Sequence, residues 1–148
     1  MSSMMDMITA GIFFIIFCLC GIVGLMIFNS LSSSTSLIPT NIASGGRDFF
    51  TALNNVALFI MIGMTLGAVM SAYMIKTNPA YIIIPIAFIF IQVVVIIPLV
   101  NSFNTITASS TMSAAAASMS NMTDLVNMMP VFSILGSLLA ALVGLTRD

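Results

Sequence analysis

Two long apolar runs with a five-residue link decide the fold: FFTALNNVALFIMIGMTLGAVMSAYMI (residues 49–75), KTNPA (76–80) and YIIIPIAFIFIQVVVIIPLV (81–100). Each run holds about 20 or more residues without a charge, and at about 1.5 Å per helical residue this crosses a hydrocarbon core about 30 Å thick. Because no water reaches the bilayer core, such runs satisfy their backbone groups as helices, even where β-branched residues dominate. The sequence predicts transmembrane helices at about 49–75 and 79–100.

The link between these runs has the residues expected of a tight turn. Lys76 stands at the negative end of the first helix, Asn78 is suited to cap the second helix, and Pro79 suits its first turn. So short a link predicts that the two helices lie side by side as a tight central antiparallel hairpin.

Composition places the whole chain in a membrane. Hydrophobic residues make up 60% of the 148 positions and charged residues 5%, with a mean hydropathy of +1.23, far from the composition of a soluble domain. The charges fall at the ends of apolar runs, as helix dipoles favour; they are Asp6, Arg47, Asp48, Lys76, Asp124, Arg147 and Asp148. We therefore interpret the charged residues as markers of helix ends. The sequence has no cluster of basic residues that would bind nucleic acid.

Two further spans complete the predicted fold. Residues 8–28 form an uncharged run, and residues 125–145 form a shorter and less apolar one, for which a helix lying in the interface is the alternative. The opening run lacks the positive start of a secretory signal, so we expect this first helix to be retained. The predicted fold is all-α, a single polytopic membrane domain (1–148) with four transmembrane helices.

Polar segments separate the outer spans from the hairpin. Residues 29–48 are rich in Ser, Thr, Asn and Gly, and predict a loop that either lies against a partner or acts as a flexible linker. Residues 101–127 include Ala and Ser around 112–122, compatible with a helix of small side chains packed flat on a partner, or with a weakly ordered segment.

Four crossings place both termini on the same side of the membrane. Lys76 and Arg147 fall on that side and Arg47 on the other, which weakly favours termini on the inside.

Small residues at four-residue spacing are the candidate helix-packing sites. They allow close approach of another backbone, and they are Gly63, Gly67 and Ser71 in the second span and Gly136, Ala140 and Gly144 in the fourth. Gln92, near the middle of the third span, is a further candidate, because an amide at that depth is costly unless it bonds to a neighbouring helix.

We interpret two asparagines and three prolines as residues with structural roles. Asn54 and Asn55 near the start of the second span are interpreted as interfacial residues at headgroup depth. Pro98 and Pro85 are expected to bend the third helix or to sit where its hydrogen bonds are already broken; Pro130 lies either in the first turns of the fourth helix or at its start.

The chain has few side chains of the types that enzymes use for catalysis. It has no His and no Glu, and its four acidic residues are Asp at helix ends or the terminus. Cys18 and Cys20 are two apart, so on a helix they face different directions and are interpreted as packing residues. We therefore expect no enzyme, no metal or other cofactor and no small-molecule substrate, and a carrier or pump is disfavoured because no carboxylate, His or Lys lies within a span.

The hairpin RDFFTALNN…AYMIKTNPAYIIIPI (residues 47–86), in a small and nearly uncharged chain, resembles the small multi-spanning membrane proteins of icosahedral viruses with a lipid membrane beneath the capsid. Corticoviruses and related double-jelly-roll viruses carry such proteins. The resemblance implies a virion component that holds the internal membrane in register with the capsid. By that interpretation residues 29–47 or 101–127 contact the protein shell.

Two other functions fit the same features. A holin-like protein would use Gly63, Gly67, Gly136 and Gly144 to oligomerise into a membrane lesion, lined by Thr65, Ser71, Gln92, Ser133 and Ser137. Its charged tail, common in holins, is reduced here to Arg147 and Asp148. An accessory subunit of a membrane complex in a bacterial or archaeal cytoplasmic membrane is the third hypothesis. In all three the partners are the bilayer and copies of the chain or other membrane proteins.

Overall fold

The computed structural model describes residues 2–33, 39–74 and 83–145. These residues form the helices α1 (Ser2–Ser33), α2 (Thr40–Met74), α3 (Ile83–Thr107), α4 (Ser113–Ser118) and α5 (Ser120–Leu145). In the described part of the chain, α1, α2, α3 and α5 are each long and apolar enough to cross a membrane. The predicted all-α polytopic class with four candidate spans is confirmed.

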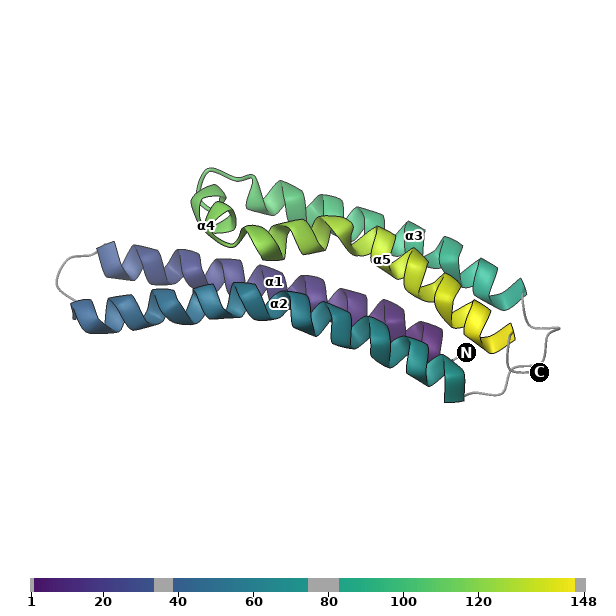
Figure 1. Cartoon of the computed structure of the whole chain (residues 1–148). Helices are drawn as coiled ribbons and strands as arrows, with labels where there is room; N and C mark the ends of the chain where they lie inside the picture. Colours follow the sequence, from purple (N-terminus) through teal and green to yellow (C-terminus); the bar gives the residue numbers. More distant parts are fainter. Residues whose placement is uncertain (1, 34–38, 75–82, 146–148) are drawn as a thin grey trace.

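The long helices form a bundle of two layers (Figure 1). One layer is the antiparallel pair of α1 and α2, and the other is the antiparallel pair of α3 and α5 with α4 at its far end. The start of α1 and the end of α5 lie at the same end of the bundle, as four crossings require.

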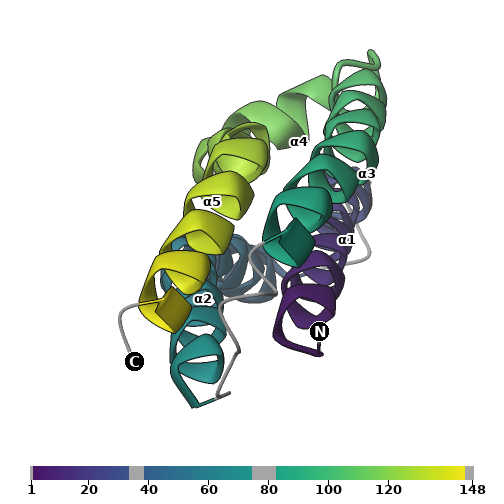
Figure 2. The same ribbon diagram turned by 90° about the vertical axis from the view of Figure 1, so that its right-hand side faces the viewer.

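The predicted side-by-side packing of the central hairpin is wrong, although α2 and α3 do run antiparallel. Among the described residues α2 packs against α1 and α5, and α3 packs against the same two helices, so α2 and α3 occupy opposite corners (Figure 2). A short link brings two helix ends together, but the apolar surface buried along the whole length decides which helices are neighbours. Lys76, Asn78 and Pro79 of the predicted turn lie outside the described residues.

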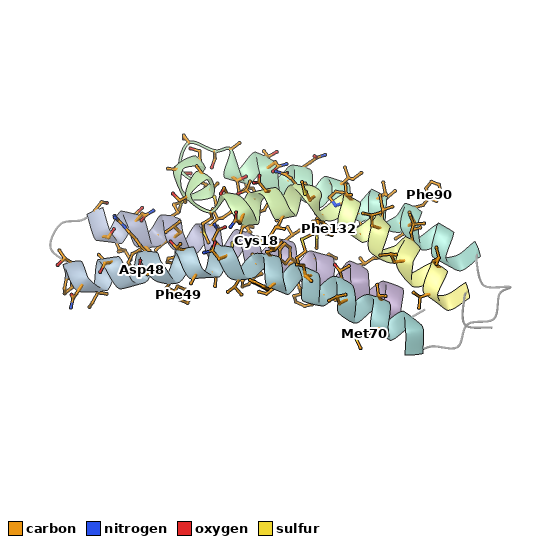
Figure 3. The ribbon with its side chains drawn as sticks, in the orientation of Figure 1. Cys18, Asp48, Phe49, Met70, Phe90 and Phe132 are labelled. Carbon is orange, nitrogen blue, oxygen red and sulfur yellow. The ribbon has the colours of Figure 1, made fainter. Side chains whose placement is uncertain are left out.

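The core follows helical spacing on each long helix, and α1 is the most enclosed of them. Its buried side chains Phe14, Cys18 and Ile22 recur every four residues, which keeps them on one face. The core also contains Ile15 and Leu25 on α1, Ala57 and Met61 on α2, Ile96, Val100 and Phe103 on α3, Met112, Ala115, Ala116 and Met119 in and beside α4, and Met122, Leu125, Val126 and Met129 on α5. Large apolar side chains also cover the outside, as expected of helices in lipid; Met70 and Phe90 point away from the bundle (Figure 3).

Two helices extend into the predicted loop at residues 29–48. The predicted first helix, 8–28, is observed as Ser2–Ser33, and the second, 49–75, as Thr40–Met74, so residues 29–33 and 40–48 are helical. Serine hydroxyls in this part bond to the carbonyl of their own preceding turn, as Ser30 does to Met26 (3.0 Å), which removes their competition with the helix.

Phe28 of α1 packs against the Gly-rich part of this segment. The Phe28 ring lies 5.8 Å from that of Phe50, and it occupies the space that a Cβ on Gly46 would need. Gly46 therefore allows an aromatic ring to lie on the backbone of α2. From composition alone, the glycines of this segment predicted a loop.

The second polar segment contains a short helix, as one of its two predictions proposed. The predicted third helix, 79–100, is observed as Ile83–Thr107, and the fourth, 125–145, as Ser120–Leu145 with Pro130 inside it. Between them α4 packs against α1, and its Ala115 and Ala116 are buried. Small side chains let this short helix lie close to its neighbour.

Candidate functional site

Asparagine side chains join α5 to two other helices. Asn54 of α2 is 7% exposed, and its Oδ1 accepts a hydrogen bond from the backbone N–H of Met122 at 3.0 Å. Met122 is the third residue of α5, where backbone N–H groups have no acceptor within their own helix. Asn54 thus caps α5 from a neighbouring helix.

Two exposed amide pairs accompany this buried cap. Asn121 of α5 donates from Nδ2 to Oδ1 of Asn55 on α2 at 3.2 Å. Asn104 of α3 donates from Nδ2 to Oδ1 of Asn127 on α5 at 2.7 Å. We call Asn54, Asn55, Asn104, Asn121 and Asn127 the asparagine layer; it fixes the start of α5 against α2 and α3.

This layer was not predicted from the sequence, in which Asn54 and Asn55 resemble headgroup-facing residues and the other three asparagines have no predicted packing role. One signal was present: Asn54, Ala57 and Met61 are three and four residues apart, which places all three on one helix face. That face is the buried one.

A small, partly open pocket lies between α1, α2 and α5, farther along the bundle than the asparagine layer. It has a volume of about 30 Å³ and is lined mainly by apolar groups, among them Gly11, Met61, Met129 and Phe132. Thr65 of α2 and Ser133 of α5 contribute its hydroxyl groups. The Ser133 side chain is 8% exposed, and its Oγ has no hydrogen-bond partner.

The predicted small-residue strip on α2 faces outwards. Gly63 and Gly67 are exposed, and a Cβ built on either would meet no atom within 4 Å. They do not pack against another described helix of the same chain. Gly136 is buried on α5, while the side-chain surroundings of Ser71, Gln92, Ala140 and Gly144 lie outside those the structure describes.

Other glycines make the close contacts between α1 and α2. A Cβ on Gly24 would lie 3.1 Å from the ring of Phe50, and a Cβ on Gly21 would lie 3.1 Å from Leu53 and 3.3 Å from the sulfur of Met122. Gly21 and Gly24 are three apart, so the four-residue spacing used to choose candidates did not include them. Large side chains on α2 fill the space that these two glycines leave.

The described residues offer no site for metal chemistry. Among them no group of three or more His, Cys, Asp or Glu side chains could hold a metal ion. Both cysteines are free; Cys18 is buried and Cys20 is exposed, so they face different directions as predicted. The polar groups that the structure brings together make helix contacts.

Comparison with protein-family models, curated proteins and solved structures found no match to this chain.

Proposed function

We propose that this chain is a non-enzymatic structural membrane protein that packs in a bilayer as part of a larger assembly, namely a virion protein that links an internal membrane to the capsid. The observation that carries the proposal is the position of its two polar segments. The end of α1, the start of α2 and the α4 region lie toward the same end of the bundle (Figure 1). A protein shell on that side could contact both segments.

The side chains at that end are suited to contacts with a protein surface. Many of the exposed side chains there are polar, although Leu31, Ile42 and Phe49 are exposed as well. One charge of each sign lies close together at Arg47 and Asp48; the other exposed polar side chains are Ser30, Ser33, Thr40, Asn41, Ser44, Ser109, Ser110, Thr111, Ser113 and Ser118. The outward surface of the spans is apolar, and the open face at Gly63 and Gly67 offers a flat strip for a neighbouring helix.

The holin-like alternative is less well supported by the positions of its lining residues. Ser133 and Ser137 are buried in the folded chain, and Thr65 lines the inner pocket. A lesion lined by these residues would require α2 and α5 to separate, which would break the asparagine layer.

Expression of the chain alone in a bacterium separates these functions. We expect harmless accumulation in the membrane, because a scaffold without its shell has no activity; abrupt loss of membrane potential would contradict the proposal and favour the lesion former. Crosslinking and mass spectrometry on the native source then identify the neighbours. A capsid protein linked through residues 29–48 or 101–127 supports the virion role, whereas cellular membrane subunits alone would overturn it.

A further inference from the structure

The pocket between α1, α2 and α5 contains an unusual pair of hydroxyl groups. Ser133 is more than nine-tenths buried, and its Oγ lies among apolar groups without a partner. A buried hydroxyl of this kind is costly unless water or another polar group bonds to it. Thr65 Oγ1 donates its own proton to the carbonyl of Met61 at 2.9 Å, so its lone pairs can still accept a hydrogen bond.

The spacing along the two helices places these hydroxyls on the same α2–α5 seam as the asparagine cap. Thr65 follows Asn54 by 11 residues, and Ser133 follows Met122 by 11 residues. Eleven residues are about three helical turns, so each helix returns to nearly the same face. Because α2 and α5 run in the same direction (Figure 1), Thr65 and Ser133 lie three turns beyond Asn54 and Met122 on the same seam, where both line the pocket.

We propose that the pocket binds one water molecule, which accepts a hydrogen bond from Ser133 and donates one to Thr65. The pocket volume of about 30 Å³ exceeds the roughly 10–15 Å³ that a water needs, and the two hydroxyls supply the two polar partners required. The lining has no charged side chain to hold an ion. The water joins α2 to α5 within the span, as Asn54 does directly at the start of α5.

Solid-state NMR on the full chain in lipid vesicles tests this site. Magnetisation is transferred selectively from water protons or from lipid acyl protons to the side chains of Ser133 and Thr65. We expect transfer from water to Ser133 in the wild type. Its absence, or transfer from acyl protons alone, would show a dry or lipid-filled pocket and overturn the proposal.

Matched threonine variants identify the partner of the water. Thr65→Val should reduce the water transfer to Ser133 at least about threefold, because the accepting oxygen is lost. Thr107→Val is the control, since Thr107, which is buried where Thr65 is half-buried, likewise bonds to its own helix, at Phe103 (2.9 Å), but does not line the pocket. Equal transfer in both variants would exclude Thr65 as a partner and overturn the bridge; circular dichroism checks that each variant folds.

Discussion

At the scale of single residues, few polar side chains hold the apolar helices in place. The side-chain oxygen of Asn54 accepts a hydrogen bond from a backbone N–H at the start of α5, a donor that the helix itself leaves without an acceptor. Such a hydrogen bond contributes more to the free energy of unfolding inside a bundle than at its surface, because no water replaces the acceptor that the buried N–H would lose. Asn55 makes its bond where it is exposed, so the neighbouring residue serves as a natural comparison.

Replacement of Asn54 tests the cap. Asn54→Ala should lower the free energy of unfolding by about 1–2 kcal/mol, because the Met122 N–H is left buried without an acceptor. Unfolding in mixed detergent micelles, followed by far-UV circular dichroism, measures this change.

Asn55→Ala provides the control at the adjacent position. Its amide pair is exposed, so the loss should be about 0.6 kcal/mol or less. Equal effects of the two variants would mean that the cap contributes no more than a surface pair.

At the scale of helices, the contact between α1 and α2 depends on glycines that face large side chains. Gly21 and Gly24 of α1 lie against Leu53 and Phe50 of α2, and Phe28 lies against Gly46 in return. The sequence predicted helix packing through small residues, among them Gly63 and Gly67, with a partner helix in this chain or in another. Their face is open in this chain, and spacing within one helix cannot tell which face meets a partner.

Leucine substitutions separate the two kinds of glycine. Gly24→Leu should lower the free energy of unfolding by about 1–3 kcal/mol, because the new side chain must displace the Phe50 ring. Gly63→Leu should leave the stability unchanged or raise it by up to about 1 kcal/mol, since leucine favours the helix and meets open space. Denaturation in the same micelles measures both, and a loss of stability in Gly63→Leu would contradict the open face.

The open face can be tested separately for a role in assembly. Gly67→Ile should leave membrane insertion and monomer stability unaltered while lowering the yield of oligomer, because the β-branched side chain prevents close approach of another helix. Crosslinking in native membranes measures the yield. An unchanged yield would show that this strip takes no part in assembly.

At the scale of the whole molecule, two antiparallel pairs pack into a bundle with distinct ends. The start of α2 and the α4 region belong to one end, whereas the start of α1 and the end of α5 belong to the other (Figure 1). This arrangement brings together two polar segments that are far apart in the sequence, and it is the basis of the proposed contact with a shell.

Cysteine labelling tests the arrangement of the ends. Both native cysteines are first replaced by alanine, and single cysteines are introduced as Ser44→Cys, Ser110→Cys and Ser3→Cys. A membrane-impermeant maleimide should label the first two from the same face of oriented vesicles, and the third from the opposite face, because α1 crosses the membrane once. Labelling of Ser44→Cys and Ser110→Cys from opposite faces would contradict the four-span topology.

The sequence by itself determined the membrane class and the all-α fold with four spans. Insertion into a bilayer depends on the hydropathy and length of each segment, and both are local properties of the sequence. It also determined the antiparallel direction of successive spans. Tertiary structure decided the rest: α2 pairs with α1 and α5 instead of α3, the Phe28 ring lies against Gly46 in the Gly-rich segment, and Asn54 is buried. The physical reason is that these outcomes depend on which surfaces meet across the bundle, and contacts between residues as distant as Asn54 and Met122 leave little trace in either helix alone.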